Sequence, residues 1–155
     1  MMTGQLARHE RSMLSLLAAG LSTVLALAVW LTPDPSGMGT HQQLGLPPCT
    51  SISVLGLRCP ACGMTTAWAL MADGQVAEAL GANLGGALLF VVALVSVPWL
   101  LWVIWTGSPK AKEQWGLFAL SGSLASMLIA FVLWAWHFAS GSILSGSIFS
   151  EALGR

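Results

Sequence analysis

The sequence predicts an all-α membrane protein with three transmembrane helices and a helical, cysteine-bearing cap between the first and the second. Composition is the first reason, because 55% of the 155 residues are hydrophobic and only 8% are charged. Six basic and six acidic side chains cannot cover a small domain with a polar surface. The second reason is the presence of three uncharged apolar runs near the length that crosses a hydrocarbon core of about 30 Å. We expect residues 1–155 to form a single membrane domain.

The first apolar run covers residues 13–31. At about 1.5 Å per helical residue it is long enough to span the hydrocarbon core. Arg8 and Arg11 precede it, and Pro33 and Pro35 follow it and disfavour helix. Because the run is longer than the roughly 7–15 apolar residues of a signal peptide, we predict an uncleaved membrane anchor.

The second and third runs cover residues 84–105 and 115–139. Tryptophans gather at their ends, where indole rings favour the boundary between lipid headgroups and acyl chains. They are Trp99, Trp102, Trp105, Trp115, Trp134 and Trp136. This placement supports the membrane prediction independently of hydropathy, and the lipid bilayer is the expected partner of these surfaces.

Small residues recur at four-residue spacing, which allows two helices to approach closely. Gly122, Ser126 and Ala130 form such a row in the third span. The first span carries Ala18, Ser22 and Ala26, and Gly81 and Gly85 precede or begin the second. These rows favour packing among the three spans, and they also allow self-association or contact with other membrane subunits. No nucleic-acid partner is expected, since the six basic residues are scattered.

The distribution of basic residues predicts a cytoplasmic N-terminus. That orientation places four basic residues inside and two outside: Arg8, Arg11, Lys110 and Lys112 against Arg58 and Arg155. The three cysteines then lie on the non-cytoplasmic side, where thiols tend to oxidise. We expect the tail, residues 140–155, to be flexible outside the membrane.

The segment at residues 33–80, which we call the cap, is too long for a turn and too apolar for a free linker. A helix is predicted from Met64 to Ala72, followed by a turn and a second helix that leads into the second span. Cys59 and Cys62 then lie near the positive end of a helix, which predicts a lowered pKa for their thiols. Asn83 is expected to find a hydrogen-bond partner on another helix, with Thr65 and Thr66 as candidates.

The cysteine pattern and the residues after it resemble a family of small bacterial membrane proteins known as domain of unknown function 2752. The resemblance covers residues 49–105 and depends on Cys49, the run Cys-Pro-Ala-Cys-Gly-Met-Thr-Thr at 59–66, and the run Asp-Gly-Gln-Val-Ala-Glu-Ala-Leu-Gly-Ala-Asn at 73–83. Thr66 stands where that family usually has arginine, and Leu84 where proline is common. The resemblance implies a multi-pass protein of the bacterial inner membrane, and it assigns no activity.

The cysteines allow several kinds of chemistry. Spacing of two residues between Cys59 and Cys62 is usual for zinc ligands, with Cys49 as a third ligand and His41 as a candidate fourth. A disulfide could instead join Cys59 to Cys62, or Cys49 to either of them. A Cys-x-x-Cys pair can also exchange disulfides, and cysteines can serve as small buried packing residues.

We therefore expect a structural or accessory membrane subunit whose outer segment is stabilised by a disulfide or a metal such as zinc. The alternative is a thiol-disulfide or metal-binding protein that acts through Cys49, Cys59 and Cys62. Catalytic residues are not predicted, since no Ser/His/Asp arrangement, phosphate-binding glycine loop or pair of carboxylates is visible in the sequence.

Overall fold

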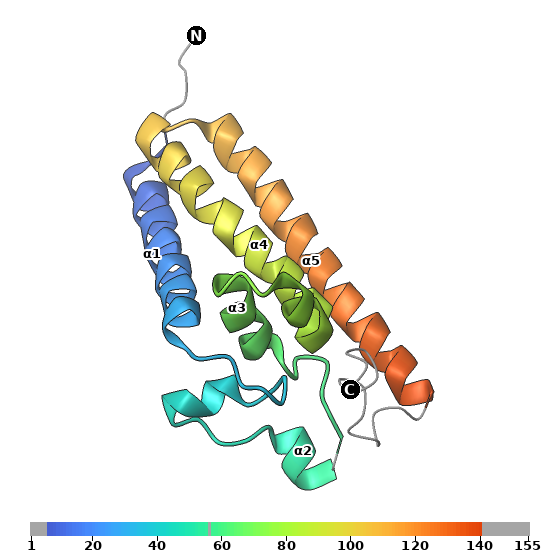
Figure 1. Cartoon of the computed structure of the whole chain (residues 1–155). Helices are drawn as coiled ribbons and strands as arrows, with labels where there is room; N and C mark the ends of the chain where they lie inside the picture. The colour runs from blue at the N-terminus through green and yellow to red at the C-terminus, as the bar shows by residue number, and fades with distance from the viewer. Residues whose placement is uncertain (1–5, 56, 141–155) are drawn as a thin grey trace.

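The computed structural model describes residues 6–55 and 57–140, and within them every regular element is a helix. In chain order the helices are α1 (Arg8–Trp30), the short 3₁₀ helix η1 (Thr40–Leu44), α2 (Thr50–Leu55), α3 (Met64–Ala72), α4 (Val76–Thr106) and α5 (Pro109–Ala139). Figure 1 shows α1, α4 and α5 as the long helices, with α3 packed beside them and η1 and α2 at one end. The all-α prediction and the helical cap are confirmed.

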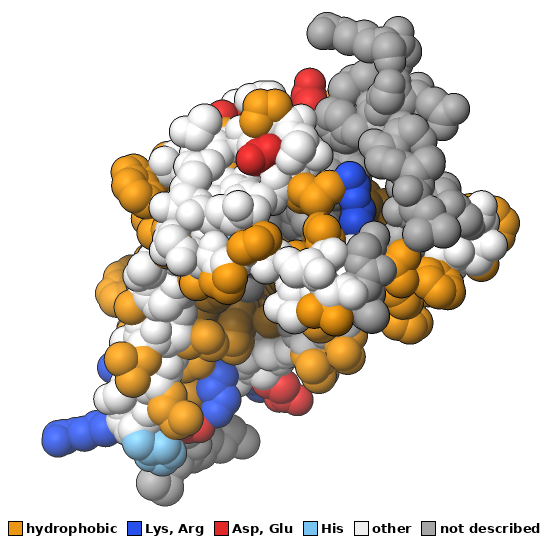
Figure 2. Space-filling view, turned by 90° about the horizontal axis from the view of Figure 1, so that it is seen from below, with side chains coloured by type: hydrophobic (Ala, Val, Ile, Leu, Met, Phe, Trp, Pro, Cys, Tyr) orange, Lys and Arg blue, Asp and Glu red, His pale blue; other side chains and the backbone are white. Residues whose placement is uncertain are grey.

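Three helices, α1, α4 and α5, are long and apolar enough to cross a membrane. Many of their outward side chains are large and hydrophobic, and in Figure 2 hydrophobic side chains lie in patches over the visible face, among backbone and polar groups. Trp105 and Trp136 remain 83% and 71% exposed, as expected for indole rings at a lipid boundary. The chain is a multi-pass membrane protein.

The long helices begin before the predicted spans because polar residues form their first turns. Thus α1 begins at Arg8 and α5 at Pro109, where the hydroxyl of Ser108 accepts a hydrogen bond from the N–H of Ala111 at 3.3 Å. Helix α4 contains one residue with non-helical dihedral angles, Asn83 (φ −163°, ψ 104°). The apolar part after this break, residues 84–106, rises about 35 Å, which matches a hydrocarbon core of about 30 Å.

The small-residue row of the third span packs inside the chain. An added Cβ at Gly85 would lie 2.5 Å from both the Cβ of Ala130 and the backbone oxygen of Ser126. Helices α4 and α5 therefore approach closely at this point. In the first span only Ala18 of its row is buried, whereas Ser22 and Ala26 are exposed. Self-association through exposed small residues stays a prediction.

The predicted basic flanks meet at one end of the bundle. The N–H of Leu6 donates to the backbone oxygen of Gly107 at 3.3 Å, and the Lys112 ammonium pairs with the Glu10 carboxylate. The guanidinium of Arg11 also lies against Gly107, at the negative end of α4. The start of α1 and the connection between α4 and α5 thus share one end, and the cap lies at the other (Figure 1). Arg155 and the predicted flexible tail beyond Ser140 lie outside the described residues.

Candidate thiolate site

A tight turn carries Cys59 and Cys62 into the start of α3. The N–H of Cys62 donates to the backbone oxygen of Cys59 at 3.0 Å, and Gly63 then adopts a left-handed conformation with φ +81°. A Cβ at Gly63 would lie 2.7 Å from the oxygen of Gly37 and 2.8 Å from that of Ala82. Both are backbone atoms that cannot turn aside, so glycine is required here for its conformation and for its lack of a side chain.

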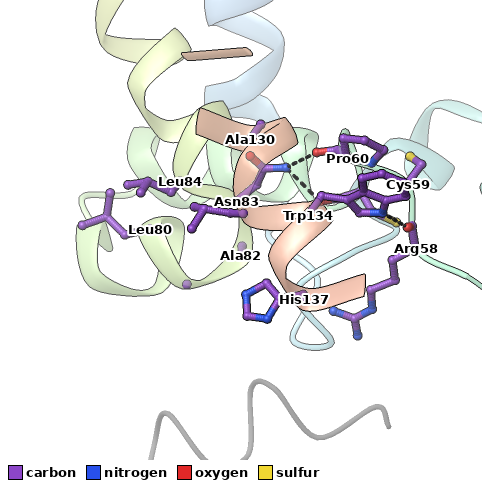
Figure 3. Close-up of a pocket in the computed structure, with 13 residues that line it drawn as sticks. Arg58, Cys59, Pro60, Leu80, Ala82, Asn83, Leu84, Ala130, Trp134 and His137 are labelled. Carbon is purple, nitrogen blue, oxygen red and sulfur yellow. Dashed lines mark hydrogen bonds between the residues drawn. The ribbon is translucent and has the colours of Figure 1, made fainter. Parts of the chain in front are cut away.

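Asn83 holds this turn from the opposite side. Its Nδ2 donates to the backbone oxygens of Pro60 at 3.0 Å and Cys62 at 3.1 Å, and its Oδ1 accepts from the N–H of Gly86 at 2.7 Å. Figure 3 shows the amide reaching across to the turn. Asn83 therefore finds its partners on the cysteine turn and not on the predicted Thr65 or Thr66, because the break in α4 aims its side chain at carbonyls that the turn leaves free.

Two further contacts fix the cap to the bundle. The Nε1–H of Trp134 on α5 donates to the backbone oxygen of Arg58 at 2.6 Å (Figure 3). On the other side, the hydroxyls of Thr40 in η1 and Thr66 in α3 are hydrogen-bonded at 2.8 Å, and both residues are fully buried. The cysteine segment is thus attached to α3, α4 and α5.

These contacts bring three cysteine sulfurs together. The Sγ atoms of Cys49, Cys59 and Cys62 all lie within 4.8 Å of one another, and those of Cys49 and Cys59 are 3.7 Å apart. All three residues are free thiols of intermediate exposure. The grouping that the sequence predicted as a possible metal or disulfide site therefore exists in space, although Cys49 is ten residues before Cys59.

The distance between the sulfurs can be compared with the distances expected in a zinc site and in a disulfide. A tetrahedral zinc with Zn–S bonds of about 2.3 Å separates its sulfur ligands by about 3.8 Å, whereas a disulfide holds its sulfurs about 2.05 Å apart. The 3.7 Å between Cys49 and Cys59 matches the edge of a metal–thiolate tetrahedron without movement of either sulfur. A disulfide between them requires the sulfurs to approach by about 1.7 Å, the difference between that spacing and the disulfide bond length.

His41 is not part of the group formed by the three sulfurs. It lines, together with all three cysteines, a cavity of about 370 Å³ between η1, the start of α2 and the start of α3. Its Nε2 is 3.2 Å from the backbone oxygen of Pro47. A role for His41 as a fourth ligand stays a prediction, and it would require the ring to leave Pro47.

The electrostatic prediction for the thiols was wrong for Cys62. Burial raises the pKa of Cys62 to about 11, and the neighbouring Cys49 and Cys59 add to the effect because they oppose another negative charge. Burial and the two neighbouring thiols therefore affect the pKa of Cys62 more strongly than the positive end of α3 does. Burial also acts to raise the pKa of Cys49, but the backbone N–H groups of Ser51 and Ile52, with the neighbouring thiols, bring it below its ordinary value.

The segment just described matches the model of a known protein family. Residues 49–97, about a third of the chain, match the family described as "Protein of unknown function (DUF2752)". This part of the chain is similar to the DUF2752 family. The match begins at Cys49 and ends within α4. Neither the curated proteins nor the solved structures gave a match.

In the DUF2752 segment the structure connects residues that are distant in sequence. The cysteine turn and Asn83, which the resemblance took from two separate runs, are directly hydrogen-bonded. Thr66, at the position where that family usually has arginine, is buried against Thr40. Trp134 lies outside the matched residues and was predicted only as an interfacial side chain. The indole N–H was the one signal of its second role, since a buried indole needs a hydrogen-bond acceptor.

Proposed function

We propose that this protein is a bacterial inner-membrane protein whose cap is held together by a metal ion, most simply zinc, on Cys49, Cys59 and Cys62. Its role is structural or accessory: the ion stabilises the outer surface that a membrane partner recognises. The observation that carries the proposal is the convergence of three sulfurs within 4.8 Å, two of them 3.7 Å apart.

The ligand type and the surroundings support a structural ion. Thiolates favour soft or borderline metals such as zinc, and a structural zinc takes four ligands. Three are cysteines, and His41, which lines the same cavity as they do, or a water would be the fourth. Metal binding would join the segment before α2 to the turn before α3, and the free energy of binding would add to the stability of the cap.

The pKa of Cys49 lies below its ordinary value, which favours its thiolate form, whereas the ion itself must displace the proton of Cys62, whose pKa is about 11. Metal affinity therefore increases with pH as protons compete less. The orientation that accompanies this proposal has a cytoplasmic N-terminus, because Arg8, Arg11, Lys110 and Lys112 gather at the end opposite the cap.

The test is the intact mass of the purified protein, measured natively and after alkylation with and without reductant. One zinc per chain, with three alkylated thiols only after chelation, supports the proposal. A Cys59→Ser variant should lose the ion and its unfolding temperature should fall, while a Ser12→Ala variant, at an exposed position near the start of α1 and far from the cap, should retain both. Three freely alkylated thiols without metal would overturn it.

A disulfide between Cys49 and Cys59 is the second candidate, because these are the sulfurs at 3.7 Å. It would close a loop of about a dozen residues and stabilise the cap by about 3 kcal/mol in the chain-entropy treatment. The same mass measurement separates the two: a disulfide leaves one thiol to alkylate before reduction and three after it, regardless of chelator.

A further inference from the structure

A second cavity lies on the other side of the cysteine turn. It has a volume of about 160 Å³ and separates the turn from the first part of α4 and the last turns of α5. Cys59 and Cys62 line both cavities, so the turn forms the wall between them. This second cavity, which we call the α4–α5 cavity, is the one drawn in Figure 3.

The lining of the α4–α5 cavity is amphipathic. Leu80, Leu84 and Leu133 supply an apolar wall from the two membrane helices. Arg58 and His137 supply polar groups, and Figure 3 shows both side chains extending toward the same side of the cavity, below Trp134. A ligand that fits both walls carries a polar, anionic group on an apolar body.

Arg58 supplies the positive charge of the cavity. Among the described residues, an ion pair joins Lys112 to Glu10 at the end of the bundle away from the cap. Arg58 takes no part in this ion pair. The hydrogen bond from Trp134 fixes the backbone of Arg58, so its side chain extends from a well-held part of the cap. A guanidinium presents several N–H donors in a planar fork that matches the oxygens of a phosphate.

The cavity lies on the cap side of two helices that are long and apolar enough to span a membrane. His137 is in the last turn of α5, and Leu84 begins the part of α4 that matches the hydrocarbon thickness. His137 is near the end of the candidate span Pro109–Ala139, and Leu84 follows the break at Asn83 within the candidate span Val76–Thr106. The cavity is smaller than the roughly 300–1,000 Å³ of sites that enclose a whole small molecule, so it has room for a headgroup while acyl chains remain in the bilayer.

We propose that the α4–α5 cavity binds the phosphate of an anionic phospholipid, with Arg58 as the main contact and His137 beside it. The apolar wall of leucines lies along the first part of the acyl chains. The proposal is independent of any metal on the cysteines, and it identifies the lipid as a ligand that fixes the cap against the ends of α4 and α5.

The test uses the full chain in a neutral detergent and native mass spectrometry. Phosphatidylglycerol and phosphatidylcholine are titrated in parallel, and bound lipid is counted. The parent should retain phosphatidylglycerol at least about fivefold better, since one basic residue near a membrane surface contributes about 1 kcal/mol toward an anionic lipid. Arg58→Gln should abolish this preference. Lys110→Gln removes an exposed basic residue at the opposite end and should keep it.

A charge-conserving variant at Arg58 shows whether an effect of Arg58→Gln comes from the lost charge or from a loss of folding. Arg58→Lys keeps the attraction and loses the planar fork, so its preference should fall between those of the parent and Arg58→Gln, with unchanged unfolding temperature. No preference in the parent, or a preference that Arg58→Gln retains, would overturn the proposal. Protection against unfolding by inorganic phosphate without lipid preference would assign the site to a free anion and would overturn the lipid assignment.

Discussion

Asn83→Ala is the substitution that most directly tests how the cap is held. The side chain makes three hydrogen bonds, at 2.7, 3.0 and 3.1 Å, to backbone groups of Gly86, Pro60 and Cys62. Each hydrogen bond contributes about 0.5–1.5 kcal/mol, so the loss of all three should cost about 1.5–4.5 kcal/mol of unfolding free energy. The upper part of this range applies if water does not reach the two carbonyl oxygens.

The assay is thermal unfolding of the purified protein in one detergent, with the metal and redox state held constant. Thr106→Ala is the matched control, because the Thr106 hydroxyl donates within an exposed helix end, to the backbone oxygen of Trp102 at 2.8 Å. That oxygen stays accessible after the substitution, so we expect a change below about 0.5 kcal/mol. Alkylation of the cysteines should also become faster in Asn83→Ala, since the turn that shelters Cys62 loses its support.

Two results would refute this reasoning. If Asn83→Ala unfolds within about 0.5 kcal/mol of the parent, the hydrogen bonds from its amide to the turn do not stabilise the cap. If it is destabilised but the thiols react at unchanged rates, the break in α4 matters for the membrane span alone and the turn is held by other contacts.

Three other substitutions or conditions give separate predictions. Gly63→Ala should be destabilised by several kcal/mol more than Gly74→Ala: both glycines are left-handed (φ +81° and +78°), but only Gly63 has backbone atoms within 3 Å of the added Cβ; equal losses in thermal unfolding would contradict this. In reduced, metal-free protein Cys49, whose pKa is lowered, should be alkylated before Cys62, whose pKa is about 11, and the rate at Cys62 should rise about tenfold per pH unit up to that value; peptide mapping gives the order of these two residues, and the reverse order would contradict the prediction. Trp134→Phe should cost about 1 kcal/mol and speed amide exchange in the cysteine segment, and unchanged exchange would show that the bond to the segment is unimportant.

The helices could be predicted because their signals are local. Met64–Ala72 is bounded by Gly63 and by the Asp73-Gly74 turn, and the structure ends α3 at the predicted residues. The membrane spans follow from length and hydropathy, since lipid leaves a long apolar run few alternatives to helix. Their starts were less accurate because polar first turns of α1 and α5 carry no hydropathy signal.

The site was predictable only in part, since it depends on tertiary contacts. Spacing identified Cys59 and Cys62 as neighbours and Cys49 as a candidate, and the fold brings their sulfurs together. The pKa of Cys62 could not be inferred, because it depends on burial and on two other thiols rather than on the helix that follows it. The hydrogen-bond partners of Asn83 depend on where the break in α4 places its side-chain amide. The periodicity of hydrophobic residues in the sequence does not show the position of this break.

Cys59 and Cys62 form a wall shared by the two cavities, so an occupant that moves this wall would couple the two binding equilibria. Cys59 and Cys62 face both the space near His41 and the α4–α5 cavity, so a shift of the turn that favours an occupant on one side alters the shape offered on the other. Thermodynamic reciprocity then applies: if the proposed ion and the proposed lipid both bind, each would change the affinity for the other by the same factor.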